Sequence, residues 1–343
     1  MRRTVKYIVL LLIMLTVGSC GDPKPSPGPD NRSKVNFAKG ADVSWVTQME
    51  RDGVKFYNSK GTEMECMALL KSLGMNTIRL RVWVNPVDGW NGKADVLVKA
   101  KRAKALGMRL MIDFHYSDSW ADPGKQNKPA AWVNLPFEEL KGALAAHTVE
   151  ILEALKGEGI YPEWVQVGNE TSDGMLWEDG RASVNMKNYT DLHNAGYRAV
   201  KEVFPEAKVI LHIAGGDDGP HYNWLLDGMA LYAPLYDIIG MSLYPDPHNW
   251  QYVNEACLIN MKELIAKYNK DVMICEVGMS WDQPEICKGF LIDLIDKALE
   301  KTDGRCLGVL YWEPQGFVNW SHYTKAAFDN TGRPTIALDA FKD

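Results

Sequence analysis

Short apolar runs alternate with longer amphipathic stretches along most of the chain from Phe37 onward. Runs that are largely apolar, or that alternate apolar and polar positions, are typical of strands in a buried sheet. The stretches between them repeat apolar residues with helical spacing, and several end in glycine, as helices do. The pattern predicts eight strands, at 39–45, 76–83, 109–115, 164–170, 208–214, 236–244, 272–278 and 307–312.

Eight strand–helix units in about 300 residues predict a (β/α)8 barrel, with one domain over 37–343. A doubly wound sheet is the alternative, but no G-x-G-x-x-G motif follows the first predicted strand. Polar or aromatic side chains stand near the end of every predicted strand, where barrels place their functional groups. They are Asp42, Trp45, Arg79, Arg81, Trp83, Asp113, His115, Asn169, Glu170, His212, Tyr244, Glu276 and Trp312.

Alternation along the strands predicts which side chains face the inside of the barrel. Arg79, Arg81 and Trp83 share one face of their strand, and we expect it to point inward. Buried arginines need anions, which Glu170 or Glu276 would supply. A purely structural salt bridge is the alternative interpretation. The same alternation turns Cys275 outward, as a buried thiol under the helices.

Glu170 and Glu276 each close an apolar run, and a buried carboxylate costs free energy unless it is paired or hydrogen-bonded. Two carboxylates facing each other across a pocket with aromatic walls match the chemistry of glycoside hydrolysis. One must be protonated and the other ionised, so their environments must differ. Glu276, with arginines and Tyr244 near, is the candidate for the ionised group and Glu170 for the acid. The residues alone leave this assignment open.

Several longer motifs carry a family resemblance that covers Lys39 to about Phe341. They are KGADVSWVTQME, NTIRLRVWVNP, HYSDSWADPGKQ, VGNETSDGMLW, SLYPDPHNW and YWEPQG. Together they resemble the arabinogalactan endo-β-1,4-galactanases of glycoside hydrolase family 53. HYSDSWADPGKQ is long and therefore specific, whereas GNE alone is shared by many barrel glycosidases.

The resemblance implies a retaining enzyme that cleaves β-1,4-galactosidic bonds in the (arabino)galactan side chains of pectin and needs no cofactor. A retaining mechanism implies carboxyl groups about 5–5.5 Å apart. The implied roles are acid/base catalysis by Glu170, nucleophilic attack by Glu276, catalytic support from Arg79, Asn169 and Tyr244, and substrate contacts through Trp83, His115, Asp118, Trp120 and Trp312.

Other functions have less support in the sequence. No HxH or HExxH motif occurs, which disfavours metal-dependent hydrolysis. GMSWDQPEICKGF passes almost directly from the seventh strand into a helix without an acidic cluster, so we expect no structural calcium there. A related barrel glycosidase acting on another β-linked polysaccharide such as mannan remains an alternative. A surface lipoprotein that binds glycan without cutting it is another, although such a protein should have lost one glutamate.

The N-terminus predicts export and a lipid anchor. Arg2, Arg3 and Lys6 precede the apolar run YIVLLLIMLTV, and the run ends in VGSC, which resembles a bacterial lipobox. Residues 1–20 therefore read as a lipoprotein signal peptide with lipidation at Cys20, followed by a Pro-rich linker at 21–36. We expect an exported lipoprotein of the cell envelope, attached to a membrane only through that lipid anchor.

Composition adds three further expectations. The net charge is −6 with no long basic run, so nucleic acid is not an expected partner. The 12 tryptophans and 14 tyrosines favour flat surfaces on which sugar rings stack. Five cysteines remain beyond Cys20, an odd number without a CxxC pair, which disfavours both a metal cage and a full disulfide framework. We expect a monomer.

Overall fold

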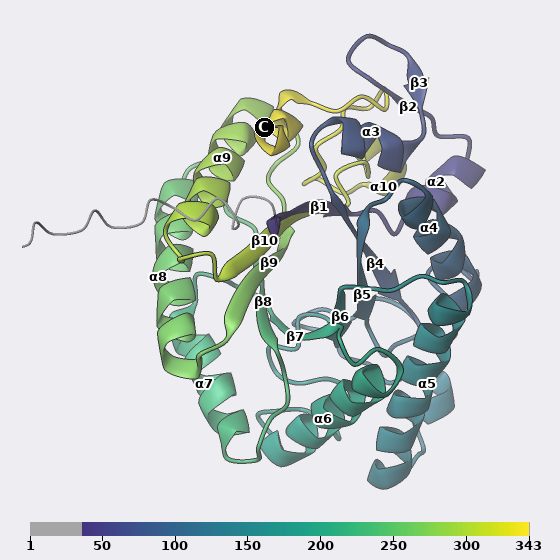
Figure 1. Ribbon diagram of the computed structural model, residues 1–343, viewed down its shortest axis with the longest axis vertical. Helices are drawn as coiled ribbons and strands as arrows, with labels where there is room; N and C mark the ends of the chain where they lie inside the picture. The colour runs from purple at the N-terminus through teal and green to yellow at the C-terminus, as the bar shows by residue number, and fades with distance from the viewer. Residues whose placement is uncertain (1–35, 343) are drawn as a thin grey trace, which may run out of the picture.

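The computed structural model describes residues 36–342, and these form a closed parallel barrel ringed by helices (Figure 1). The order of strands around the barrel is β1-β10-β9-β8-β7-β6-β5-β4, so every strand pairs with its neighbours in the chain and the last pairs with the first. The predicted (β/α)8 barrel is therefore confirmed. All eight predicted strands are present, with ends that differ by a few residues.

The barrel strands are β1 (Ala38–Asp42), β4 (Thr77–Val82), β5 (Arg109–Phe114), β6 (Trp164–Val167), β7 (Lys208–Ile213), β8 (Ile238–Leu243), β9 (Asp271–Val277) and β10 (Cys306–Trp312). The helices are α2 (Val46–Arg51), α3 (Cys66–Ser72), α4 (Lys93–Ala105), α5 (Phe137–Gly157), α6 (Met186–Val203), α7 (Gly219–Ala230), α8 (Trp250–Tyr268), α9 (Pro284–Glu300) and α10 (Val318–Ser321), with short 3-10 turns η1 (Ala130–Trp132) and η2 (Ile336–Phe341). The sequence pattern did not predict the small hairpin of β2 (Phe56–Tyr57) and β3 (Glu63–Met64).

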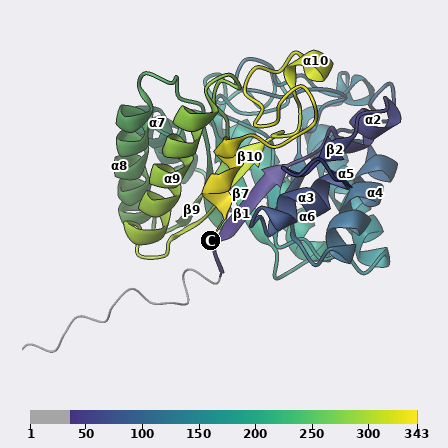
Figure 2. The ribbon, with the colours of Figure 1, turned by 90° about the horizontal axis from the view of Figure 1, so that it is seen from above.

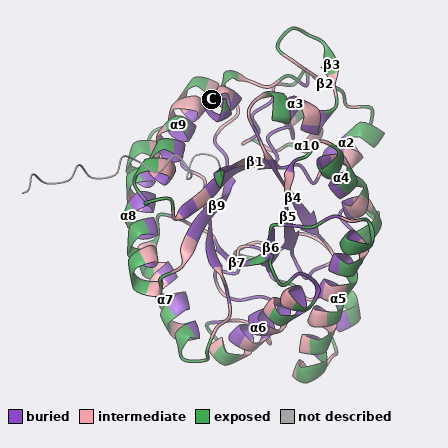
Figure 3. Cartoon of the chain, viewed as in Figure 1, coloured by how far each residue is buried: buried purple, intermediate pink, exposed green. Residues whose placement is uncertain are grey.

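Both faces of the barrel strands are buried (Figure 3). One face of each strand packs against the inner faces of the helices, as Ile78, Leu80 and Val82 of β4 do. The side chains of the other face fill the interior of the barrel. Toward the N-terminal ends of the strands these side chains form an apolar layer. Its members are Ala38, Met111, Trp164, Ile210, Ile238, Met273, Cys275 and Leu310. Between this layer and the C-terminal ends of the strands the interior is polar, because Arg79, Arg81 and their partners occupy it.

One orientation predicted from alternation is wrong. Met241 of β8 pairs with Ile274 of β9, but the next pair is Ser242 with Glu276, so Cys275 is an extra residue in a β-bulge. Cys275 consequently points into the apolar layer inside the barrel, and not outward under the helices. The bulge lets Glu276 face the interior as well. Cys275 is nevertheless a buried thiol, as are Cys66, Cys257, Cys287 and Cys306.

The loops that follow the strands gather at one end of the barrel, together with α10, while the C-terminus lies toward the other end (Figure 2). The predicted signal peptide at 1–20, the lipidation site Cys20 and all but the last residue of the linker at 21–36 lie outside the described residues. These assignments stay predictions. No helix within residues 36–342 combines the length and apolar character needed to span a bilayer.

Candidate active site

A cavity of about 390 Å³, the central cavity, opens at the C-terminal end of the barrel strands. Both predicted glutamates line it, Glu170 from the turn after β6 and Glu276 from the end of β9. The remaining lining residues are His115, Trp120, Ala121, Asp122, Asn169, Tyr244, Trp312, Tyr323 and Lys325. The structure thus brings together the two glutamates, a third carboxyl group from Asp122, four aromatic side chains, an imidazole, an amide and a lysine.

Glu276 is held by a cation and a phenol. Its Oε1 lies 2.8 Å from Nη2 of Arg79, and the Tyr244 hydroxyl donates a hydrogen bond of 2.7 Å to its Oε2. Burial raises the pKa of Glu276, Arg79 opposes that rise, and the neighbouring Glu170 adds to it. Arg79 and Tyr244 both contact Glu276 directly, and both favour its carboxylate form over its protonated form.

Arg79 lies at the centre of a fully buried polar network beneath the cavity. Its guanidinium donates to Oδ2 of Asp42 at 2.8 Å, to Oδ2 of Asp113 at 2.9 Å, to Oε1 of Gln166 at 2.7 Å and to Oδ1 of Asn169 at 2.9 Å. These contacts fix the guanidinium in one orientation. Asp42 and Asp113 therefore act inside the barrel as buried partners of Arg79.

Glu170 stands on a sharp turn that aims its side chain into the cavity. Gly168 and Glu170 have φ angles of 87° and 46°, and the Glu170 N–H donates to Nδ1 of His212 at 3.2 Å. Burial raises the pKa of Glu170 to about 7, opposed by a hydrogen bond with Ser242 and by Arg79. Within residues 36–342 no lysine or arginine forms an ion pair with Glu170. This carboxyl group can therefore hold a proton near neutral pH.

His212 and Asn169 tie the Glu170 turn to the barrel. The His212 ring contacts Gln166 at 2.9 Å and Ser242 at 2.8 Å, so both of its nitrogens have partners inside the barrel. The Asn169 amide donates one hydrogen to the Ala121 carbonyl oxygen at 2.8 Å. Within residues 36–342 the Asn169 amide nitrogen donates to no second acceptor.

His115 and Asp118 lie in the predicted groove, but the protein already occupies their polar atoms. Nδ1 of His115 accepts from the Ala121 N–H at 3.1 Å and from the Trp83 indole at 3.3 Å, and Nε2 faces Asp113 at 3.0 Å. Asp118 accepts from two backbone N–H groups, those of Asn85 at 2.9 Å and Ala130 at 2.8 Å. His115 therefore presents its ring to the cavity, while Asp118 shapes the loop beside it.

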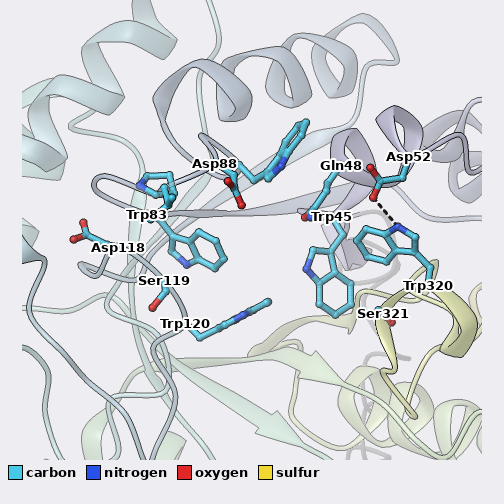
Figure 4. Close-up of a pocket in the computed structure, with 13 residues that line it drawn as sticks. Trp45, Gln48, Asp52, Trp83, Asp88, Asp118, Ser119, Trp120, Trp320 and Ser321 are labelled. Carbon is cyan, nitrogen blue, oxygen red and sulfur yellow. Dashed lines mark hydrogen bonds between the residues drawn. The ribbon is translucent and has the colours of Figure 1, made fainter.

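A second cavity of about 510 Å³ adjoins the first, and we call it the tryptophan cavity (Figure 4). Its lining comprises Trp45, Gln48, Asp52, Trp83, Pro86, Val87, Asp88, Trp90, Asp118, Ser119, Trp120, Trp320 and Ser321. Trp120 lines both cavities, and its ring centroid lies 5.7 Å from that of Trp312 in the central cavity. The two cavities together form one aromatic groove across the end of the barrel.

Residues 38–288 match the family model described as Glycosyl hydrolase family 53. The chain belongs to glycosyl hydrolase family 53. It is 34% identical to the Endo-beta-1,4-galactanase of Bacillus subtilis (strain 168), with 81% of this chain and 70% of that protein covered. It is 31% identical to the Arabinogalactan endo-beta-1,4-galactanase of Thermothelomyces thermophilus, with 89% and 98% covered. The Ignisphaera aggregans GH53 catalytic domain superimposes with a TM-score of 0.82 at 30% identity, with 93% and 98% covered.

Some residues of this family 53 site were not foreseen from the sequence. Arg81 pairs with Glu313, at 2.5 Å, and not with Glu170 or Glu276 as expected. Glu313 follows directly after the eighth strand, in YWEPQG. An acid at the end of a barrel strand was the feature of the sequence that could have identified it as a partner for Arg81. Tyr323 and Lys325 reach the central cavity from a loop beyond the barrel strands, and no local pattern marks them. Within residues 36–342 no group of three or more His, Cys, Asp or Glu side chains is arranged to hold a metal ion.

Proposed function

We propose that this protein is an endo-β-1,4-galactanase that cleaves the (arabino)galactan side chains of pectin with retention of configuration. The membership of family 53 and the galactanase relatives, matched over most of their lengths, support the substrate class. The observation that supports the mechanism is the ion pair and hydrogen bond that favour the carboxylate form of Glu276, in one cavity with Glu170, which has no lysine or arginine as an ion-pair partner within residues 36–342.

The first step uses both glutamates at once. A carboxylate oxygen of Glu276 attacks the anomeric carbon and forms a glycosyl ester, while the glycosidic C–O bond breaks. Glu170 gives its proton to the departing oxygen, so the shortened chain leaves as an alcohol. Burial of Glu170 favours this role because it keeps the proton on the carboxyl group at neutral pH.

The second step reverses the use of Glu170. As a carboxylate it takes a proton from water, the water oxygen attacks the anomeric carbon, and the Glu276 ester bond breaks. Arg79 and Tyr244 then receive the free carboxylate of Glu276 in the geometry it had at the start. The second amide hydrogen of Asn169 is placed to bond the 2-hydroxyl of the sugar in the cleavage subsite, and Trp312 provides its floor.

The aromatic groove suits a polymer better than a single sugar. Trp120 continues the central cavity into the tryptophan cavity, where Trp83 and Asp118 lie, so neighbouring sugar units can rest on indole faces. The groove is open at the surface and so admits a chain along its length. This arrangement favours attack within the polymer, with His115 and Trp120 forming the wall near the cut.

The anchoring of the enzyme is a separate proposal. The lipobox-like sequence before Cys20 supports an exported, lipid-anchored monomer of the cell envelope. Expressed in a bacterial host and separated by ultracentrifugation, the full chain should sediment with membranes, and the Cys20→Ala variant should lose that association. Equal distributions of the two proteins would overturn the proposed anchor.

Release of reducing sugar from β-1,4-galactan tests the proposed activity. β-Mannan, carboxymethylcellulose, xylan and β-1,3-galactan serve as parallel substrates, and Glu276→Gln is the inactive control. We expect turnover of β-1,4-galactan alone. Turnover of another polymer would keep the two-glutamate mechanism and overturn the substrate. No turnover of any of the five by folded protein would favour glycan binding without cleavage.

A further inference from the structure

Arg81 is a second buried arginine inside the barrel, and the mechanism described above does not use it. It lies two residues after Arg79 on β4 and is as fully buried. Nη1 of Arg81 lies 2.5 Å from Oε1 of Glu313 and 3.8 Å from Oδ1 of Asp42. A buried cation of this kind requires a close anion, and Glu313 provides it.

The rest of the Arg81 guanidinium is surrounded by indole rings. Its central carbon lies 4.2 Å from the ring centroid of Trp120, 5.4 Å from Trp45, 5.5 Å from Trp83 and 5.9 Å from Trp312. Nε and Nη2 of Arg81 have no hydrogen-bond acceptor among residues 36–342. Cation–π attraction to the rings therefore accounts for most of the contacts of this cation.

The same four rings line the groove. Figure 4 shows the indoles of Trp45, Trp83 and Trp120 on the walls of the tryptophan cavity, and Trp312 lies in the central cavity. The rings meet edge to face, with centroids 5.8 Å apart for Trp45 and Trp120 and 5.2 Å apart for Trp83 and Trp120. A ring that turned would disturb its neighbours, and Arg81 is the shared contact beneath them.

Glu313 links this cation to the loop after β1. Its carboxylate accepts the N–H of Trp45 at 3.1 Å and the side-chain amide of Gln315 at 2.5 Å. Its own backbone has a φ of 46°, and its N–H donates to the Asp42 carbonyl oxygen at 3.0 Å. The carboxylate that pairs with Arg81 thus also fixes the backbone of one of the four tryptophans.

Resting on the proposed function, we propose that Arg81, held by Glu313, is a positioning residue that sets the orientation of the groove tryptophans and so governs binding of the galactan chain. Arg79 and Arg81 then divide their roles along one strand. Arg79 orients the nucleophile, and Arg81 orients the surface on which the sugar rings rest. A merely structural ion pair would stabilise the fold without affecting binding selectively.

Steady-state kinetics on β-1,4-galactan separate the two roles. For Arg81→Lys and Arg81→Met we expect KM to rise about tenfold for the methionine variant and less for lysine, because cation–π contacts are lost or weakened, with kcat within about twofold of wild type. On a nitrophenyl β-galactoside that fills only the cleavage subsite, the change in KM should be smaller. A KM that stays unchanged on galactan, or a kcat that falls equally on both substrates, would overturn the proposal.

Arg109→Met is a matched control. Arg109 also stacks on an indole, 4.3 Å from the Trp164 centroid, and also pairs with a glutamate, Glu163 at 2.6 Å. It lies at the first residue of β5, at the opposite end of the strands from the groove. We expect Arg109→Met to leave KM and kcat on galactan unchanged.

If wild type does not cleave galactan, the proposed substrate is wrong, and the structural test below still decides the role of Arg81.

The structural test needs no substrate. Arg81→Met leaves the buried carboxylate of Glu313 without a cation, and this variant can fail to fold for that reason. The double variant Arg81→Met with Glu313→Gln removes both charges and avoids this cost. Crystal structures of Arg81→Lys and of the double variant should show changed or multiple rotamers for Trp45 and Trp120 on an unchanged barrel. Rings that keep their wild-type orientations in both structures would overturn the proposal.

Discussion

At the scale of single residues, the two glutamates of the site differ in the groups that surround them, and we propose different roles for them on that basis. Burial raises the pKa of both glutamates, but only Glu276 has Arg79 and Tyr244 within 2.8 Å, whereas Glu170 has no ion-pair partner within residues 36–342. Burial alone would push both carboxyl groups toward the protonated form. Arg79 contacts Glu276 directly and favours its carboxylate form, which makes the surroundings of the two carboxyl groups different.

The rate should fall on the alkaline side as Glu170 loses its proton. Its pKa is about 7, raised by burial, and the acid must be protonated in the first step. We therefore expect kcat/KM on galactan to decrease as pH rises through about 7. A pH–rate profile of the wild type checks this. An alkaline limb that persists at the same pH in Glu170→Gln would assign it to another group.

Glu170→Gln should distinguish substrates by their leaving groups. We expect kcat/KM on galactan to fall by about 10²–10⁴, the usual contribution of a general acid. A dinitrophenyl β-galactoside should lose much less, because its leaving group departs without a proton. Both substrates are measured with the same enzyme preparation. Equal losses on the two substrates would contradict the assignment of Glu170 as the acid.

At the scale of elements, departures from regular strand geometry direct the two proposed catalytic glutamates into the cavity. The bulge at Cys275 turns Glu276 into the barrel, and a left-handed turn after β6 places Glu170. Gly168 in that turn has a φ of 87°, and a Cβ there would lie 2.5 Å from Cγ2 of Thr171. The backbone of the turn therefore depends on glycine.

Gly168→Ala should displace the turn that carries Asn169 and Glu170. We expect kcat on galactan to fall by at least about tenfold and the free energy of unfolding to fall by about 1–3 kcal/mol, from positive-φ strain and the contact with Thr171. Gly107→Ala is the matched control, since Gly107 has a φ of 66° with nothing within 4 Å of its added Cβ. It should lose stability only and keep kcat. Equal losses of kcat in both variants would contradict the prediction.

The alternation of side chains along the predicted strands predicted the barrel and the inward orientation of Arg79, because inward and outward side chains alternate regularly in most strands of this protein. They failed at Cys275, where an inserted residue reverses the alternation and leaves no local trace in composition. Glu313 was missed because its partner, Arg81, is 232 residues away in the chain. Tyr323 reaches the cavity through a loop path that no periodicity encodes. The strand-end pattern predicted the two glutamates, whereas their separate roles and the substrate were implied by the resemblance to family 53.

At the scale of the whole molecule, buried titratable groups couple stability to pH in opposite senses. Burial lowers the pKa of His147 and of His193 to about 4, and raises the pKa of Glu313 to about 7. On acidification the unfolded chain gains protons on the histidines before the native protein does, which lowers stability. The buried glutamate takes up its proton earlier in the native protein and so opposes that loss.

His193→Gln isolates one of these groups. The native pKa of His193, about 4, lies below its unfolded value, so its stabilising contribution is full above pH 6.5 and is lost as pH falls toward 4. Between pH 7.5 and 4.5 we expect wild type to lose about 2–3 kcal/mol more than the variant. Urea unfolding at the two pH values measures the difference. If the difference in unfolding free energy between wild type and His193→Gln is the same at both pH values, the lowered pKa of His193 is contradicted.

The five cysteines within residues 36–342 can report on how the folded protein opens. All five thiols are buried, so a thiol reagent in solution can reach them only when the surrounding structure separates. Cys275 lies in the apolar layer inside the barrel, whereas Cys66 and Cys287 lie between barrel and helices. The order in which these thiols are modified, followed by mass spectrometry, would therefore give the sequence in which the helical shell and the barrel interior come apart.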